Sequence, residues 1–276
     1  MTLSLTTTVT LHDAVEMPQF GLGVFKSEPG PEVESAVTEA LELGYRHIDT
    51  AEIYKNEEGV GRAVAASGID RGEIFITTKV WNSDQGYDST LAAVDASLGR
   101  LGMEYVDLYL VHWPKPEHTH DTWRAMEQLQ MDGKARAIGV SNFLVHHLDQ
   151  LAERASVMPS INQIEFHPHL QSPELVAYCD AHGIIVEAWS PLKHGQIIDD
   201  LELKTIADAH GVSVAQVALR WMLQRGIVTI PKSVTPARIA QNADLYGFAL
   251  SDGEVAAIDA MDRNERVGPN PDEIDF

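Results

Sequence analysis

The feature that most constrains the fold of this 276-residue chain is a repeated alternation of short apolar runs with segments of helical periodicity. Each apolar run is rich in branched and aromatic residues and ends at polar residues, which is typical of buried strands. Eight such runs occur: FGLGVF, YRHID, EIFITTK, YVDLYLVH, ARAIGVSN, SINQIEF, IIVEAWS and IVTIP. Helical spacing separates them near 33–41, 56–66, 91–101, 121–132, 143–155, 173–182 and 199–224.

This alternation predicts an α/β protein whose parallel strands close into a (β/α)₈ TIM barrel. Before the first unit, TTTVTLHDAVEMP alternates around His12 and Asp13 and predicts an N-terminal β-hairpin. A doubly wound open sheet is the alternative fold, but the first βα turn, GLGVFKSEPG, lacks a G-x-G-x-x-G pattern that opens directly into a helix. No linker-like segment divides the chain, so we expect residues 1–276 to form a single barrel domain.

The charge of the chain is strongly negative and unevenly distributed. A formal net charge of −21 argues against a general binder of nucleic acids or anionic membranes. Residues 209–243 nevertheless contain no Asp or Glu, although they keep Arg220, Arg225, Lys232 and Arg238. Burial of a helix and a strand explains part of this gap, but PKSVTPARIAQN is polar and predicts an electropositive site for a small polyanion. We ascribe the excess acid to solubility, with adaptation to salt as the alternative.

The rest of the composition is typical of a globular cytoplasmic protein. Hydrophobic residues make up 44% of the chain and charged residues 22%, and no apolar run approaches the roughly 20 residues that span a bilayer. The N-terminus lacks the basic start and continuous apolar core of a signal peptide. The single cysteine, Cys179, excludes an internal disulfide and is expected to be a small buried residue. No coiled-coil heptad or long apolar edge demands a partner, so we expect a monomer.

Four residues at predicted strand ends point to proton-donating chemistry. Asp49, Lys79 and His112 each close a strand-like run, and Tyr54 follows shortly after Asp49. The C-terminal ends of barrel strands share one mouth, so these side chains are expected to meet. Tyrosine is a weak acid with a pKa of about 10, and we expect Lys79 to lower the pKa of Tyr54 by about 2–3 units. With Asp49 keeping Lys79 charged and His112 orienting a substrate, the group could polarise a carbonyl and protonate the resulting alkoxide.

Two other functions stay open at this point. Glu165, His167 and His169 alternate in IEFHPHL, a spacing that could present ligands to one metal ion, as in barrel hydrolases. Pro168 interrupts that strand and no second set of ligands stands out, so we predict no metal site. The second alternative is a nucleotide-sensing or regulatory barrel with little turnover, against which the intact set of four residues argues. No G-x-S-x-G motif supports acyl transfer.

The chain resembles the aldo-keto reductases over its whole length, and is closest in style to bacterial 2,5-diketo-D-gluconate reductases. The motifs that carry the resemblance are GYRHIDTAEIYKNEEGVGRA, Lys79 followed by VWN, VDLYLVHWP, GKARAIGVSNF, NQIEFHP, WSPL and IPKSVTPARIAQN. The resemblance implies reduction of aldehydes or ketones to alcohols by hydride transfer from NADPH. It also implies that Asp49, Tyr54, Lys79 and His112 form a catalytic tetrad with Tyr54 as the general acid.

The resemblance further implies which residues hold the cofactor and the substrate. It assigns the nicotinamide carboxamide to Ser141, Asn142 and Gln163, the stacking on the ring to Trp189, the pyrophosphate path to Ser190 and Leu192, the 2′-phosphate to Lys232, Ser233 and Arg238, and the adenine to Asn242. Gln241 stands where relatives often carry Glu, so the adenine contact is expected to be weaker or differently made. The expected pocket walls are Phe25, Ile53, Trp81 and Trp113. By resemblance, the tail RVGPNPDEIDF is expected to cover the pocket and to set substrate preference.

Overall fold

A barrel of eight parallel strands forms the centre of the computed structural model, which describes residues 3–274. Strands that follow one another in the sequence are neighbours in the sheet. They are β3 (Leu22–Gly23), β4 (His47–Asp49), β5 (Phe75–Val80), β6 (Val106–Val111), β7 (Ala135–Ser141), β8 (Ile161–Glu165), β9 (Ile185–Trp189) and β10 (Val228–Thr229). All eight predicted strands are therefore confirmed.

The first and last strands meet and close the ring. Phe20 pairs with Thr229, and Gly23 pairs with Lys232, both in parallel bridges. A Cβ at Gly23 would lie 2.9 Å from the carbonyl oxygen of Ile230, so this seam requires a residue without a side chain. The predicted barrel is confirmed, and the doubly wound alternative is wrong.

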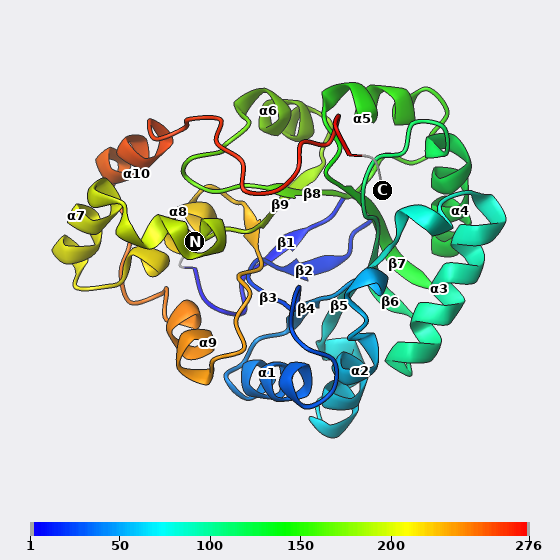
Figure 1. Ribbon diagram of the computed structural model, residues 1–276, viewed down its shortest axis with the longest axis horizontal. Helices are drawn as coiled ribbons and strands as arrows, with labels where there is room; N and C mark the ends of the chain where they lie inside the picture. Colours follow the sequence, from blue (N-terminus) through cyan, green and yellow to red (C-terminus); the bar gives the residue numbers. More distant parts are fainter. Residues whose placement is uncertain (1–2, 275–276) are drawn as a thin grey trace.

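Helices surround the barrel on its outside (Figure 1). They are α1 (Pro31–Glu42), α2 (Glu57–Ala66), α3 (Tyr87–Leu101), α4 (Thr119–Met131), α5 (Val145–Ala152), α6 (Pro173–Ala181), α7 (Leu201–His210), α8 (Val214–Gln224), α9 (Pro236–Ala243) and α10 (Asp252–Asp259). Helices α1 to α8 occupy the predicted helical segments. Helices α9 and α10 were not predicted from the sequence.

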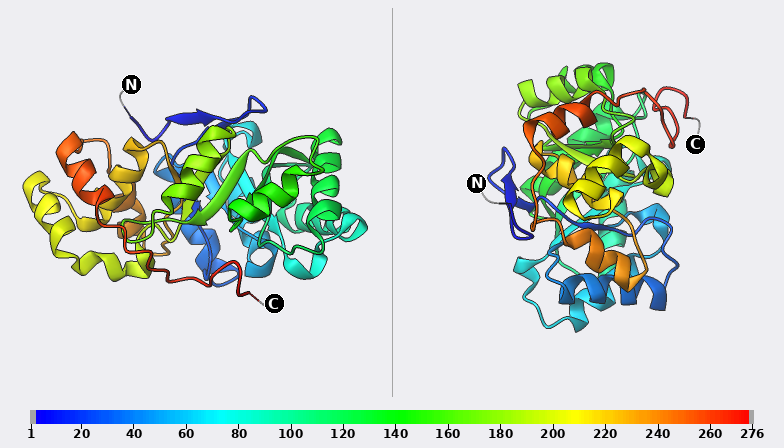
Figure 2. Two further views of the ribbon diagram at one scale, coloured as in Figure 1. Left: turned by 90° about the horizontal axis from the view of Figure 1, so that it is seen from above. Right: turned by 90° about the vertical axis from the view of Figure 1, so that its left-hand side faces the viewer.

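The two ends of the barrel are covered by different parts of the chain. The predicted hairpin consists of β1 (Thr8–Thr10) and β2 (Glu16–Pro18), which pair in antiparallel fashion. Leu11 and Met17 of this hairpin region pack with Phe75, which lies at the start of its barrel strand. Figure 2 shows the hairpin and the C-terminal segment at opposite ends of the molecule. The C-terminal ends of the strands therefore face the same side as the tail, whose residues 275–276 lie outside the described part of the chain.

No helix within residues 3–274 is long and apolar enough to cross a membrane. Cys179 in α6 is fully buried, as predicted, and burial raises the pKa of its thiol to about 11. The thiol is therefore protonated and shielded at neutral pH.

Candidate active site

The site begins with an ion pair between two neighbouring strands. Asp49 closes β4 and Lys79 lies near the end of β5, which pairs with β4 in parallel. The Nζ atom of Lys79 lies 2.7 Å from both carboxylate oxygens of Asp49 and donates a hydrogen bond of 2.8 Å to the carbonyl oxygen of Thr50. Although burial opposes the ammonium form, Asp49 and Tyr54 raise the pKa of Lys79 above its ordinary value. Lys79 is therefore a buried cation at neutral pH.

Tyr54 lies beside this ion pair, in the short 3₁₀ helix Glu52–Tyr54. The Nζ atom of Lys79 is 5.2 Å from the centre of the Tyr54 ring. Burial raises the pKa of Tyr54 to about 12, and the charge of Lys79 offsets this effect only in part. The predicted net lowering of the pKa of Tyr54 is therefore wrong, because loss of hydration outweighs the attraction of the phenolate to Lys79. Lys79 still makes the phenolate easier to form than it would be in an uncharged site.

His112 brings a neutral imidazole to the same place, directly after β6. Its ring packs edge-on against the rings of Tyr54 and Trp81, with centroid separations of 5.7 and 5.1 Å. Burial, and after it the charge of Lys79, hold the pKa of His112 well below its usual range. A neutral imidazole can donate one N–H to a carbonyl oxygen. The structure thus brings all four predicted catalytic residues together at one mouth.

Side chains at the ends of β7, β8 and β9 form a connected hydrogen-bond network. Ser141 Oγ donates to the carbonyl oxygen of Gln163 at 2.9 Å. The side-chain amide of Asn142 donates to Ser141 Oγ at 3.0 Å and to the carbonyl oxygen of His112 at 2.9 Å. The indole N–H of Trp189 donates to Asn142 Oδ1 at 2.8 Å. The residues predicted to contact the nicotinamide therefore lie together and are linked directly to His112.

Gln163 also connects this network to a carboxyl group that was not predicted from the sequence. Its Nε2 atom donates to Asp49 Oδ2 at 2.8 Å and to Glu187 Oε2 at 2.9 Å. Glu187 lies in β9 and is fully buried. Burial, followed by the charge of Asp49, raises the pKa of Glu187 to about 8. The available signal was an acid within the apolar run IIVEAW, where an unpaired carboxylate is unfavourable.

The turn after β9 contains the two residues predicted along the pyrophosphate path. Ser190 adopts a left-handed backbone conformation with φ of 50°. Leu192 is half-buried and packs against the apolar core. Both residues follow the C-terminal end of a barrel strand and so lie on the same side of the barrel as the tetrad.

The residues predicted to bind the 2′-phosphate and adenine lie after β10 and on α9. Lys232 is exposed next to the barrel seam, and Ser233 is buried just before α9 begins. Arg238 and Gln241 are exposed on α9, whereas Asn242 is buried. Two exposed cations and a hydroxyl thus belong to one short segment, in which Lys232 and Ser233 precede α9 and Arg238 lies on it.

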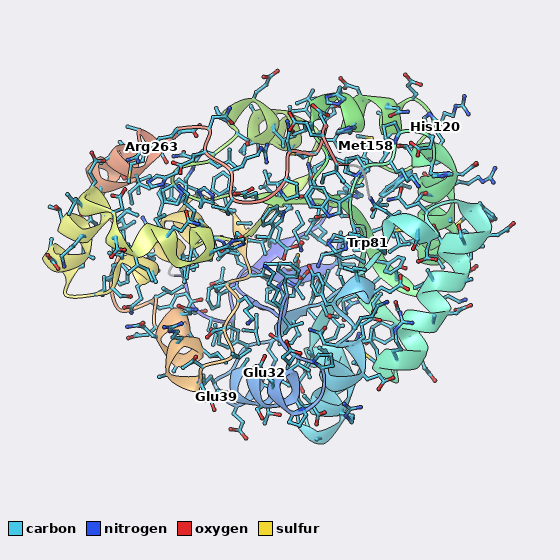
Figure 3. The ribbon with its side chains drawn as sticks, viewed as in Figure 1. Glu32, Glu39, Trp81, His120, Met158 and Arg263 are labelled. Carbon is cyan, nitrogen blue, oxygen red and sulfur yellow. The ribbon has the colours of Figure 1, made fainter. Side chains whose placement is uncertain are left out.

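The four residues predicted as pocket walls are Phe25, Ile53, Trp81 and Trp113. The ring of Phe25 lies 5.0 Å from that of Tyr54, and Trp81 contacts His112 as described above. Trp113 packs edge-on against Trp189 at 6.4 Å. Ile53 is half-buried next to Tyr54 in the chain. In Figure 3, Trp81 lies inside the ring of helices, whereas Glu39 and His120 lie at its outer rim.

The side chains proposed for the alternative metal site do not converge on one point. His167 Nε2 lies 3.1 Å from Glu165 Oε1, whereas His169 Nε2 lies 3.0 Å from Asp200 Oδ2. Glu165 is also an acceptor for two backbone N–H groups of the C-terminal tail. These residues therefore belong to contacts between the strand ends and the tail.

Within residues 3–274, the ligand atoms that do converge belong to His146, His147 and Asp272. The Nδ1 atom of His147 accepts a hydrogen bond of 3.1 Å from the backbone N–H of Leu144. A neutral His147 therefore carries its proton on Nε2, the atom that faces Asp272 at 3.5 Å. In this tautomer Nε2 is a donor, and metal binding there would require loss of the helix cap.

Comparisons with known proteins agree with this geometry. Residues 19–263 match the Aldo/keto reductase family. Glyoxal reductase of Bacillus subtilis (strain 168) is 58% identical to this chain over 276 residues, and the alignment covers 100% of both chains. Methylglyoxal reductase DkgA of Escherichia coli (strain K12) is 45% identical, with 97% of this chain and 98% of the relative covered. The crystal structure of a Gox0644 mutant in complex with NADPH is 44% identical, with a TM-score of 0.92 over 98% of this chain and 99% of that one. This chain therefore belongs to the aldo/keto reductase family.

Proposed function

We propose that this chain reduces small aldehydes and ketones, foremost α-dicarbonyl compounds, to alcohols with NADPH. The observation that carries the proposal is the buried Lys79–Asp49 ion pair, with contacts of 2.7 Å, beside Tyr54 and a neutral His112. The relatives named glyoxal reductase and methylglyoxal reductase support the substrate class. The NADPH complex of a similar structure supports the cofactor.

Carbonyl reduction needs a hydride at carbon and a proton at oxygen. NADPH supplies the hydride when bound. Tyr54, kept as a phenol by its raised pKa, donates its proton to the carbonyl oxygen as negative charge develops there. The phenolate that remains is stabilised by Lys79, which Asp49 holds in place. His112 donates a hydrogen bond to the same oxygen and fixes its direction.

The hydrogen-bond network at the ends of β7 to β9 supports a site for the nicotinamide. Both N–H groups of the Gln163 side chain already donate to the carboxyl groups of Asp49 and Glu187, so its oxygen is the group that can accept from a carboxamide. Ser141 and Asn142 lie beside it, and the aromatic face of Trp189 offers a surface for ring stacking. We assign the carboxamide to Ser141, Asn142 and Gln163, and the stacking to Trp189.

The exposed cations after β10 support a site for the adenosine 2′-phosphate. We assign this phosphate to Lys232, Ser233 and Arg238, because Lys and Arg form strong charge-assisted hydrogen bonds with a dianion. Ser190 and Leu192 then lie along the pyrophosphate, and Gln241 and Asn242 lie next to the adenine. No acid within 209–243 opposes a phosphate in this segment.

We further propose that residues 1–276 form one domain and that Phe25, Ile53, Trp81 and Trp113 wall the substrate pocket. Both apolar clusters of the described chain contain side chains of the barrel strands, which supports a single domain. The monomeric state and the cytoplasmic location stay predictions from the sequence.

Substitution of Tyr54 tests the proposed chemistry. Tyr54→Phe removes the proton donor and keeps the ring, so we expect kcat for methylglyoxal to fall by about 10²–10⁴-fold. NADPH affinity, measured by quenching of tryptophan fluorescence, should stay close to wild type. Tyr105→Phe is the matched control, because it removes a tyrosine hydroxyl outside the mouth. Full activity of Tyr54→Phe would contradict the mechanism, whereas a wild type that binds NADPH but does not turn over would favour the regulatory alternative.

A further inference from the structure

The last residue of β8 and the segment after it, residues 165–171, contact the C-terminal tail, which we define as residues 262–274. The carbonyl oxygen of His169 accepts hydrogen bonds from the backbone N–H groups of Arg263 and Glu265, at 3.1 and 3.0 Å. Lys193, in the turn after β9, forms an ion pair of 2.6 Å with Glu265. The tail is thus fixed to strand ends on the catalytic side of the barrel, and it passes along β8 and β9 in Figure 1.

The most deeply buried of these contacts is made by Glu165, the last residue of β8. Its Oε1 accepts the backbone N–H of Val267 at 2.6 Å, and its Oε2 accepts the backbone N–H of Gly268 at 3.0 Å. His167 lies 3.1 Å from Oε1. The side chain of Glu165 is completely buried, so both oxygens depend on these partners. One carboxylate therefore grips two consecutive peptide groups of the tail.

The charge state of Glu165 suits this contact. Burial opposes its ionisation, but hydrogen bonds from His167, Val267 and Gly268 outweigh burial and lower the pKa of Glu165 below its ordinary value. A carboxylate accepts with both oxygens, and hydrogen bonds to a charged acceptor are stronger than those between neutral groups. The contact is therefore a charged clasp that persists at neutral pH.

Gly268 places the tail backbone directly against Trp189. A Cβ at this position would collide with the Cη2 atom of Trp189 and would lie 3.1 Å from Glu165 Oε2. Gly268 does not adopt a positive φ. Glycine is therefore needed here because there is no space for a side chain, and not because of the backbone conformation. The opposite edge of Trp189 is held by the hydrogen bond from its indole N–H to Asn142. The tail and Asn142 thus hold the indole from two sides.

We propose that Glu165 is a positioning residue that clasps the tail at Val267 and Gly268 against Trp189, and so sets substrate preference. The inference rests on the proposed function, because Trp189 is assigned there to the nicotinamide. If the clasp opens, the tail withdraws from the mouth and the indole loses its support. Small substrates, which have few contacts of their own, depend most on an enclosed pocket.

Limited proteolysis measures the clasp without any turnover. Trypsin cleaves after Arg266, and the scissile bond includes the Val267 nitrogen that Glu165 holds. In Glu165→Gln one oxygen becomes an NH₂ donor that faces a tail N–H, so we expect cleavage at this bond to accelerate about tenfold or more. Gly268→Ala should accelerate it similarly through collision with Trp189, although Glu165 is intact. A cleavage rate equal to wild type in both variants would overturn the proposal.

Kinetics then tests the effect on substrate choice. For both variants we expect KM for methylglyoxal to rise about tenfold while kcat stays within about threefold, and KM for a bulky aromatic aldehyde to change much less. The double variant should be no worse than either single variant, because both open the same clasp. Faster cleavage with unchanged KM values and an unchanged substrate preference would show that the clasp does not set substrate preference.

Matched controls separate the clasp from general destabilisation and from failure of the proposed function. Asp272→Asn alters the outer part of the tail, where Asp272 contacts His146 at 2.9 Å, and should leave both the cleavage rate and the preference near wild type. Thermal unfolding of each variant shows whether the barrel is intact, and Gly268→Ala keeps the test open if Glu165→Gln does not fold. A wild type without reductase activity would refute the proposed function, whereas the proteolysis result would still decide the clasp.

Discussion

Glu187 holds a proton inside the barrel, between Gln163 and His47. Its Oε1 lies 3.7 Å from Nε2 of the neutral His47, and Asp49 and Lys79 are the charged groups that act on it. Because burial raises its pKa from 4.5 to about 8, the folded state binds a proton that the unfolded state has released between these values. The contribution of Glu187 to the free energy of unfolding is therefore full below pH 4.5 and is lost as pH rises towards about 8.

A variant without this titration isolates the effect. Burial lowers the pKa of His47 from 6.5 to about 3, which gives the opposite slope at acid pH, but this slope fades above pH 6.5 as His47 loses its proton in the unfolded state too. We expect urea unfolding of the wild type to show a steeper fall in stability between about pH 6.5 and 8 than that of Glu187→Gln. Identical slopes would mean that Glu187 is ionised throughout.

At the scale of elements, α9 carries the predicted selectivity for NADPH over NADH. Arg238 is exposed on this helix and belongs to the acid-free segment. In Arg238→Ala we expect KM for NADPH to rise about tenfold to a hundredfold, since a charged hydrogen bond to the phosphate is lost. The KM for NADH, which lacks that phosphate, should not change.

Arg154→Ala is a charge-matched control for this prediction, because Arg154 is also exposed but lies just beyond α5. It should leave both KM values unchanged. Equal increases for NADPH and NADH in Arg238→Ala would show that Arg238 contacts a part common to both cofactors.

Most helices and strands could be predicted because their apolar patterns are strong. Helix α9 is an exception. Barrel strands such as β5 and β6 are buried on both faces, so they appear as short, largely apolar runs, and the order of the runs matches the order of the sheet. Helix α9 is only eight residues long, and Ile239 is the one large apolar side chain on its buried face, so its apolar pattern is too short to recognise. The phosphate segment was recognised from its charge, but its helical backbone could not be predicted from that signal.

The residues of the candidate site could be predicted better than their pKa values and hydrogen bonds. Parallel strands bring Asp49, Lys79 and His112 to one end, so their proximity follows from the topology. The pKa of Tyr54 depends on how completely the packed rings exclude water, which spacing along the chain does not reveal. Glu187 was missed for a similar reason, because its role depends on contact with Gln163 across two strands.

On the scale of the whole molecule, the net charge of −21 predicts a response to salt. Screening of self-repulsion should raise the unfolding temperature as NaCl increases, and the rise should level off near about 0.2–0.3 M, where the Debye length falls below about 7 Å. Thermal unfolding monitored by circular dichroism checks this. A rise that continues into the molar range would support adaptation to salt instead of solubility.

The hairpin at the N-terminal end of the barrel affects how ligands enter and leave. Within residues 3–274, Leu11 and Met17 fill that end of the barrel with apolar side chains, so we expect ligands to enter from the opposite end, on the side of the tail. We expect the cofactor, the carbonyl compound and the alcohol to bind and leave at this same end. A bound molecule can therefore block the binding or release of another. At high substrate concentration, we therefore expect kcat to depend on the order in which alcohol and cofactor are released as much as on proton or hydride transfer.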